Sequence, residues 1–415
     1  MREMKDSGLQ WAGDIPQYWN IAKGKHFMAV LERPVRDDDN VITCFRDGEV
    51  TLRSNRREDG FTVATVEAGY QGIEPGDLVV HGMDGFAGAI GISDSRGKGT
   101  PALNVLSCSE NKKYIMYLLR AMAYTEVFMA LSTGIRVRTC DTNWKKLKSL
   151  DYLIPPADEQ QCIADFLDAK CAEIDALTAD IQTQIDTLEQ YKRSVITETV
   201  TKGLNPNAEM KDSGIQWIGN MPARWDVVRG KYILHYMQKP VREDDGVITC
   251  FRDGEVTLRS NRREEGFTMS DKEIGYQGID VGDLVVHGMD GFAGSIGISD
   301  SRGKASPVLN VLDTDQCKRY IMYYLRSMAY SDVFLALATG IRVRSCDLRW
   351  NKLAELSYPV PPLDEQNAIV KHIDSVLSKA DAVIADKEAQ LATLDEYKKS
   401  LIFEYVTGKK EVPVS

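Results

Sequence analysis

Apolar residues recur at regular intervals in two long polar segments of the chain. In the first segment a seven-residue spacing joins five positions, with Leu177 and Ile185 between them: Leu167, Ile174, Ile181, Leu188 and Val195. In the second, which Lys387 interrupts, the apolar positions are Ile373, Leu377, Ala380, Ile384, Leu391, Leu394 and Leu401. This spacing is typical of a coiled-coil seam. About 40 residues of helix would extend about 60 Å.

Local signals predict where these helices begin and end. Prolines at 155 and 156 end the preceding segment, and Asp158 with Gln161 has the spacing of a capping box. Asp364 is the corresponding cap of the second helix, and Gly203 is a stop signal for the first. Each apolar stripe could instead cover the core of the neighbouring globular part as a lid. The matched length of the two segments favours helices that pair with each other and hold the globular parts apart.

Short apolar runs precede each long helix. Runs rich in Val, Ile and Gly, such as 77–81 and 87–93, lie between glycine-bearing turns and predict strands. The stretch 113–133 has the spacing of one amphipathic helix that ends at Gly134. We therefore predict a mixed α/β lobe before each long helix.

The whole pattern is a duplication. MKDSG at Met4 recurs at Met210, and GDLVVHGMDGFAG at Gly76 recurs at Gly282, so the offset is 206 residues in both cases. The predicted fold class is α+β, with two duplicated lobes and two long helices. The expected boundaries are 1–154 for the first lobe, 155–203 for the central helix, 204–360 for the second lobe and 361–415 for the C-terminal helix.

Composition narrows the functional class only slightly. The chain is 43% hydrophobic and 27% charged, has no run of 18 apolar residues and starts with a polar segment, so we expect a cytoplasmic globular protein. The eight cysteines form no CxxC pair, which argues against a disulfide framework or a zinc site. The net charge is −10, but residues 151–203 carry 4 basic and 11 acidic residues whereas 1–150 carry 20 and 19. The overall sign therefore does not exclude nucleic acid.

Motifs of common enzymes are missing from the sequence. It lacks a Walker A loop, HExxH, GxSxG, the acidic cluster of many nucleases, and the cofactor and amine-binding motifs of a methyltransferase. The glycines of HGMDGFAGAIG do not have dinucleotide-binding spacing and are expected to mark strand turns. His81 with Asp84 is a weak catalytic signal, and the alternatives are a base-edge contact or a hydrogen-bonded histidine at a strand end. The sequence predicts a binding protein with no metal site.

A basic segment appears once in each repeat. Residues 43–60 match 249–266 at 17 of 18 positions, charged positions included. Arginine forks suit guanine and phosphate, and asparagine suits adenine, so we predict DNA contact. The alternative is that the arginines pair with the acidic residues between them on a solvated surface. The candidates in the first repeat are Arg46, Arg53, Asn55, Arg56, Arg57, His81, Met83, Asp84, Arg136 and Arg138; in the second they are Arg252, Arg259, Asn261, Arg262, Arg263, His287, Met289, Asp290, Arg342 and Arg344.

Several stretches together resemble the specificity subunit of type I restriction-modification systems. They are MKDSGLQWAGDIPQYW from Met4, MKDSGIQWIGNMPARWDVVRGKYI from Met210, IPPADEQQCIADFLDAKCAEIDAL from Ile154 and PPLDEQNAIVKHIDSVL from Pro361. The resemblance covers essentially the full length. It implies two target-recognition domains separated by helices that pair as an antiparallel coiled coil, and a ruler role for the pair between the halves of a split DNA site.

The same resemblance implies partners. Two methyltransferase subunits that bind S-adenosylmethionine would flank the chain, motor-nuclease subunits would bring ATP and Mg²⁺, and no cofactor would bind this chain. The acidic helices would then be docking surfaces for protein. The near-identical lobes depart from the usual dissimilar pair, and two-fold protein symmetry is mirrored by palindromic DNA, so we predict an interrupted palindrome. Three alternatives stay open: a phage-defence complex with a different effector, a scaffold that binds only protein, and an enzyme built around His81 and Asp84.

Overall fold

The computed structural model describes residues 2–56, 68–130, 142–262, 274–336 and 348–413. The chain forms two compact units: Met1–Ile181 with Glu388–Ser415, and Gln182–Lys387. Each unit holds one lobe, the first half of the long helix that follows it, and the second half of the other long helix. In the described ranges no helix is both long enough and apolar enough to cross a membrane.

The lobe of unit 1 is built from short antiparallel strands around a four-stranded sheet of order β4-β11-β8-β9. The strands of that sheet are β4 (Met28–Val30), β8 (Leu78–His81), β9 (Ile90–Ile92) and β11 (Leu103–Cys108). The two-stranded sheets are β1 (Met4–Asp6) with β2 (Asp14–Pro16), β3 (Asn20–Lys23) with β12 (Asp151–Ile154), β5 (Ile42–Cys44) with β6 (Val50–Leu52), and β7 (Gln71–Ile73) with β10 (Gly97–Gly99).

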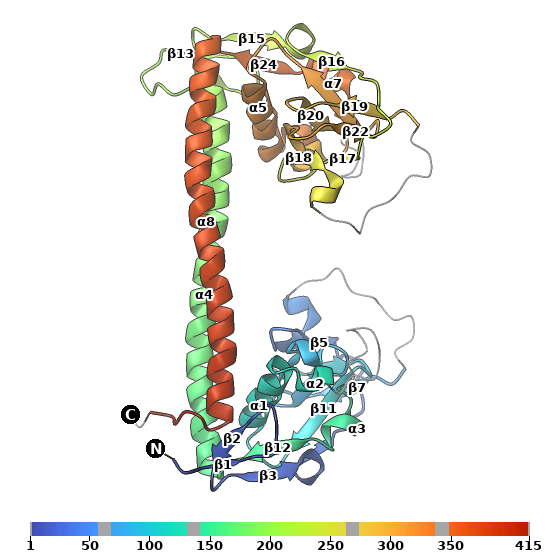
Figure 1. Cartoon of the computed structure of the whole chain (residues 1–415), viewed down its shortest axis with the longest axis vertical. Coiled ribbons are helices and arrows are strands. Elements are labelled where there is room, and N and C mark those ends of the chain that lie inside the picture. The colour runs from blue at the N-terminus through green and yellow to red at the C-terminus, as the bar shows by residue number, and fades with distance from the viewer. Residues whose placement is uncertain (1, 57–67, 131–141, 263–273, 337–347, 414–415) are drawn as a thin grey trace. The chain divides into compact units, whose positions relative to one another are not determined.

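Both faces of the four-stranded sheet are buried. Leu78 and Val80 of β8 face the main core, and Val79 between them faces a second apolar cluster. This explains why β8 reads as a continuous apolar run instead of an alternating one. Helix α1 (Lys112–Tyr124) covers the first face, and the β5–β6 hairpin, whose Ile42 belongs to the second cluster, covers the other (Figure 1).

The helix expected over 113–133 is interrupted, so that prediction was wrong in its length. Helix α1 ends at Tyr124, and the short helix α2 (Val127–Ala130) follows after Glu126, whose φ of 59° is left-handed. A left-handed residue cannot continue a right-handed helix, so the chain changes direction there. The predicted stop, Gly134, lies outside the described residues. Helix α3 (Trp144–Leu147) precedes β12.

The long helices are α4 (Ala157–Lys202) and α8 (Leu363–Val406). Each helix starts one residue before its predicted capping residue, so Asp158 and Asp364 lie inside the first turn. A carboxylate there still interacts favourably with the helix dipole. Glu159 is also in that first turn, and it accepts a hydrogen bond from the buried indole of Trp19 at 3.0 Å. Gly203 (φ 73°) ends α4 as expected.

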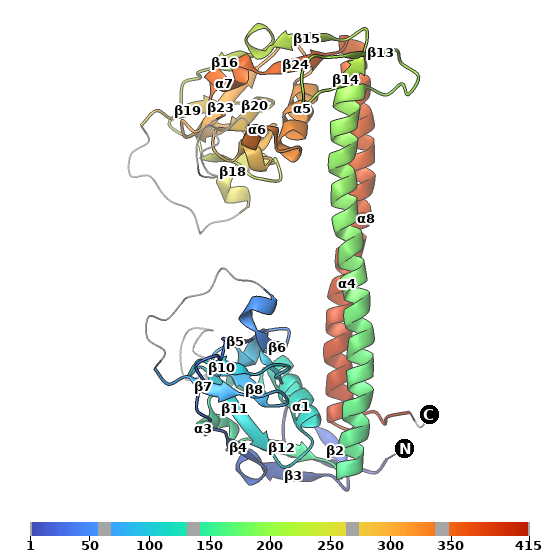
Figure 2. The same ribbon diagram turned by 180° about the vertical axis from the view of Figure 1, so that it is seen from behind.

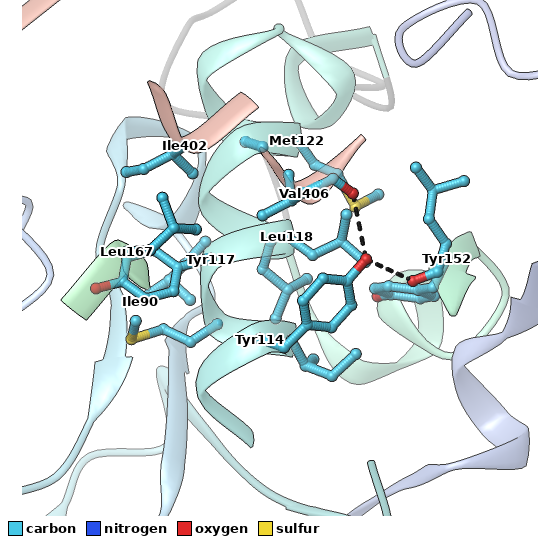
Figure 3. Packing of buried hydrophobic residues seen from close by; sticks show 14 of the residues in the cluster. Ile90, Tyr114, Tyr117, Leu118, Met122, Tyr152, Leu167, Ile402 and Val406 are labelled. Carbon is cyan, nitrogen blue, oxygen red and sulfur yellow. Dashed lines mark hydrogen bonds between the residues drawn. The ribbon is translucent and has the colours of Figure 1, made fainter. Parts of the chain in front are cut away.

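The main core of each lobe is completed by both long helices. In unit 1, Leu167 of α4 and Ile402 and Val406 of α8 are fully buried around α1 (Figure 3). The hydroxyl of Tyr114 on α1 lies within hydrogen-bond distance of two backbone carbonyls, those of Leu153 and Val406. The lid alternative is therefore partly right, because each helix half covers a lobe while it also pairs with the other helix.

Unit 2 repeats this architecture, and α5 (Lys318–Tyr330) lies between its sheet and the long helices (Figure 2). Its four-stranded sheet, of order β16-β23-β20-β21, uses β16 (His235–Met237), β20 (Leu284–His287), β21 (Ile296–Ile298) and β23 (Leu309–Asp313). The other strands are β13 (Met210–Asp212), β14 (Asn220–Pro222), β15 (Asp226–Arg229), β17 (Ile248–Cys250), β18 (Val256–Leu258), β19 (Gln277–Ile279), β22 (Gly303–Ala305) and β24 (Ser357–Val360). The short helices are α6 (Val333–Ala336) and α7 (Trp350–Glu355).

The long helices are antiparallel within each unit. In unit 1, Phe166 contacts Tyr405, and Asp175 pairs with Lys398 at 2.6 Å. In unit 2, Gln184 contacts Lys387, and Lys192 pairs with Asp381. Among the predicted seam residues, those that are buried are Leu167, Ile174, Ile181, Ile373, Ile384 and Leu401, and those that are half-buried are Leu188, Val195, Leu377, Leu391 and Leu394. Leu177, expected between seam positions, is 48% exposed, and Ile196 and Ile402 are buried positions that the heptad pattern did not select.

Candidate DNA-reading site

The basic segment forms the β5–β6 hairpin and the 3₁₀ turn that follows it. Alternate residues Ile42, Cys44 and Val50 are buried in the apolar cluster under the sheet, which fixes the hairpin to the lobe. The tight turn needs Gly48, whose φ is 89°. The charged side chains between the buried positions therefore face outward on a rigid support.

Two arginines of this segment, Arg46 and Arg56, contact neighbouring side chains. The guanidinium of Arg56 lies 4.3 Å from the centre of the Phe45 ring and pairs with Asp47 and Glu49. Arg46 pairs with Asp84 at 2.8 Å while its side chain is 67% exposed. For Arg56 the structure thus shows the acidic pairing that the alternative interpretation expects. Exposed pairs of this kind are worth less than about 1 kcal/mol, so a phosphate or a base edge can replace the carboxylates.

The other members of the segment have local contacts. Nε of Arg53 donates to the hydroxyl of Thr43 at 3.3 Å. The amide of Asn55 donates to Thr51 at 2.8 Å, which ties the 3₁₀ turn to β6. The equivalent residues of unit 2 make the same bonds, Arg259 to Thr249 and Asn261 to Thr257.

The HGMDGFAG loop follows β8 and is held by hydrogen bonds to His81. Nδ1 of His81 accepts hydrogen bonds from the backbone amides of Met83 at 3.2 Å and Asp84 at 3.0 Å. An accepting Nδ1 carries no proton, so neutral His81 has its proton on Nε2 and is a donor there. Met83 at the loop tip is 57% exposed, an unusual position for a large apolar side chain. Gly88, with a φ of 93°, makes the turn into β9, as the glycine pattern predicted.

These two elements line an open cavity in each unit. In unit 1 it has a volume of about 880 Å³. Its lining includes Thr43, Cys44, Phe45, Arg46, Asp47, Arg53, Arg56, His81, Met83 and Asp84. The cavity of unit 2 is about 640 Å³ and includes the counterparts Arg252, Arg262, His287 and Asp290. Predicted residues that are about 40 positions apart in sequence therefore converge on one site.

Some predicted residues cannot be placed. Arg57, Arg136, Arg138, Arg263, Arg342 and Arg344 lie outside the described residues. Met289, the counterpart of Met83, is 52% exposed and is held by the same bond to His287.

One residue that positions the site, Arg120, is not among the residues predicted from the sequence. Arg120 is buried in the otherwise apolar face of α1, and its guanidinium donates to the carbonyl of Gly48 at 2.9 Å and to that of Ile90 at 2.8 Å. It thereby fixes the hairpin turn to the sheet. Arg326 does the same in unit 2, through Asp253 and Ile296. An arginine at an apolar helix position in both repeats was the available signal.

His81 and Asp84 are not arranged as a catalytic dyad. The carboxylate of Asp84 is 4.0 Å from Nδ1 of His81, whose lone pair is taken by backbone amides. Burial raises the pKa of the Cys44 thiol to about 12, so it is protonated and a poor nucleophile. Within the described part of the chain no three His, Cys, Asp or Glu side chains are grouped to hold a metal ion.

Burial lowers the pKa of His81 and of His287 below the ordinary 6.5, although the neighbouring carboxylate, Asp84 or Asp290, opposes the shift. The unfolded chain therefore binds more protons near pH 6, and stability falls as the pH drops below about 6.5. We expect the urea midpoint to be lower at pH 5.5 than at pH 7.5. In the variant His81→Gln, His287→Gln, in which the amide oxygen can accept the same bonds without titrating, this decrease should be smaller. An equal decrease in both proteins would contradict the assignment.

The chain is similar to known proteins that share one description. No protein-family model matches the chain. It is 24% identical over 444 residues to a protein of Methanocaldococcus jannaschii whose name assigns it as the MjaX specificity subunit of a type I restriction enzyme, with 96% of this chain and 95% of that protein covered. It is 19% identical over 428 residues to the StySPI specificity subunit of Salmonella potsdam, with 96% and 90% covered.

The fold also matches a solved structure from a study of complex assembly and conformational transition in a type I restriction-modification system. The TM-score is 0.67 at 13% identity, with 95% of this chain and 99% of that chain covered. At this identity the likeness concerns the fold, and it includes both lobes and both long helices.

Proposed function

We propose that this chain, a homologue of the specificity subunits of type I restriction enzymes, selects the DNA site for such a system. A specificity subunit is itself not an enzyme. The observation that carries the proposal is the cavity in each unit, where arginine side chains stand beside a rigid loop with an exposed methionine. Arginine forks on a rigid support suit base edges and phosphates.

The two cavities support a split target. Two arginines, the histidine and the loop aspartate recur at equivalent positions in both cavities, so each cavity would read the same core half-site. The long helices are antiparallel within each unit, which is the arrangement expected if the repeats are related by a two-fold axis. The proposed target is an interrupted palindrome whose gap is set by the helix pair.

Specificity subunits of type I systems assemble with methyltransferase and restriction subunits. We further propose two methyltransferase subunits per chain, which would bind S-adenosylmethionine, and restriction subunits that would bring ATP and Mg²⁺. Exposed acidic positions on the long helices, such as Glu173 and Glu198, would form the protein-docking surface. Such an acidic surface does not favour DNA binding, because its carboxylates repel the DNA phosphates.

Single-molecule methylome sequencing of a host that carries the complete system tests the proposed target. We expect modified adenines in one motif whose two halves share a core sequence on opposite strands, separated by a fixed gap of unspecified bases. A host without this chain is the control and should lack the motif. Two unrelated half-sites would refute the palindrome while leaving DNA recognition intact.

A further inference from the structure

The reading cavities of the two units differ in hydrogen-bonding groups as well as in size. Across the loop segment 76–98 and its counterpart 282–304 the repeats match at 22 of 23 positions, and the one difference is Ala89 against Ser295. Ser295 lines the cavity of unit 2. The substitution therefore changes the wall of the proposed reading site and leaves its arginines alone.

The hydroxyl of Ser295 has no hydrogen-bond partner among the residues that the structure describes, although the residue is only 1% exposed. Leaving a buried hydroxyl unpaired destabilises the folded state, because the group loses its hydrogen bonds to water and gains none in return. Ala89 occupies the equivalent position in unit 1 and is 0% exposed. The backbone is the same in both units: the amide of Ala89 donates to the carbonyl of Asp84, and the amide of Ser295 donates to that of Asp290. The fold thus gains nothing from the hydroxyl, and a ligand in the cavity could satisfy it.

Two nearby differences accompany Ser295. Val308 replaces Ala102, which lines the cavity only in unit 1, and the unit 2 cavity is the smaller one, at about 640 Å³ against about 880 Å³. Thr142 in unit 1 donates its hydroxyl proton toward the carbonyls of His81 and Gly82, whereas its counterpart Leu348 has no hydroxyl. The environment of the loop is therefore more apolar in unit 2 apart from Ser295.

We propose that the Ser295 hydroxyl is a specificity-determining group of unit 2, which hydrogen-bonds a base edge, directly or through one bound water, at a position that unit 1 reads less strictly. The inference rests on the proposed function and refines it: the two half-sites share a core, but one position is discriminated in one half only. A hydrogen-bonding group in the wall of a binding site disfavours bases that leave it unpaired.

Selection of bound duplexes from a randomised pool tests this with the full chain and its methyltransferase subunits. For the natural chain we expect one position whose base preference is roughly tenfold stronger in one half than at the mirrored position, which corresponds to about 1.4 kcal/mol. Ser295→Ala should lower that preference to the level of the mirrored position. Ala89→Ser should raise the mirrored position instead, so that both halves become equally strict.

The controls separate the hydroxyl from its surroundings and from folding. Val308→Ala and Leu348→Thr change the size and polarity near the loop and should keep the asymmetry. Ser295→Ala should melt at the same temperature as the natural chain or higher, because it removes an unpaired hydroxyl. Equal preferences in both halves of the natural chain, or an asymmetry that survives Ser295→Ala, would overturn the inference. Selection of no sequence at all would overturn the proposed function itself.

Discussion

Replacing Arg56 and Arg262 together by alanine should weaken binding to the target duplex at least about 30-fold, because each contact to a base contributes about 1–3 kcal/mol. Both guanidinium groups lie over a phenylalanine ring at 4.3 Å and line the cavities. The loss has a second cause: Asp47 and Glu49 would lose their partner and face the phosphates uncompensated. Titration of a labelled duplex with the chain measures the effect.

The matched control removes the same charge elsewhere in the lobes. Arg36 and its counterpart Arg242 are exposed and do not line the cavities. Their double alanine variant should weaken binding much less and alike for target and unrelated DNA, and a phosphate contact among them would also reduce the salt slope. If the two double variants lose affinity equally, the effect is one of net charge, and the assignment of Arg56 is wrong.

Because the chain is a duplication, much of the fold could be predicted from the sequence. The repeat of 206 residues and the heptad spacing predicted two lobes and two long helices, because buried positions on a helix must recur with its turn. The break of α1 at Glu126 was not readable, because a left-handed residue there follows from packing and the type of side chain does not demand it. The same holds for Ile402, which is buried because α8 lies against α1 as well as against α4.

The candidate site was predicted in its residues but not in its internal contacts. The sequence indicated both the basic segment and the HGMDGFAG loop, and their convergence on one cavity needed the β5–β6 hairpin to pack on the sheet through Ile42 and Val50. Pairing of Arg56 with Asp47 depends on the hairpin turn, which brings residues nine positions apart together. The contact of Arg120 with Gly48 could not be predicted, because a single arginine in an amphipathic helix usually faces water.

Replacing Ile196 and Ile402 by alanine should destabilise each unit by about 2–5 kcal/mol, the usual cost of a buried Ile→Ala change. These equivalent residues are 2% and 0% exposed, and each joins the core of a lobe to a long helix. Below the melting temperature the lobes should keep their reading cavities, since neither residue lines one. The helix pair, however, would hold them less firmly.

The consequence for function is a change in spacing selectivity. If the helix pair is the ruler, duplexes whose gap is one base pair longer or shorter than the target should be methylated nearly as well as the target by this variant, whereas the natural chain discriminates between them. Ser194→Ala with Ser400→Ala is the matched control, because these equivalent positions are exposed on the same helices. It should leave both stability and gap preference unchanged. A variant with lower thermal stability but unaltered gap preference would show that the gap is measured elsewhere, for example by the partner subunits.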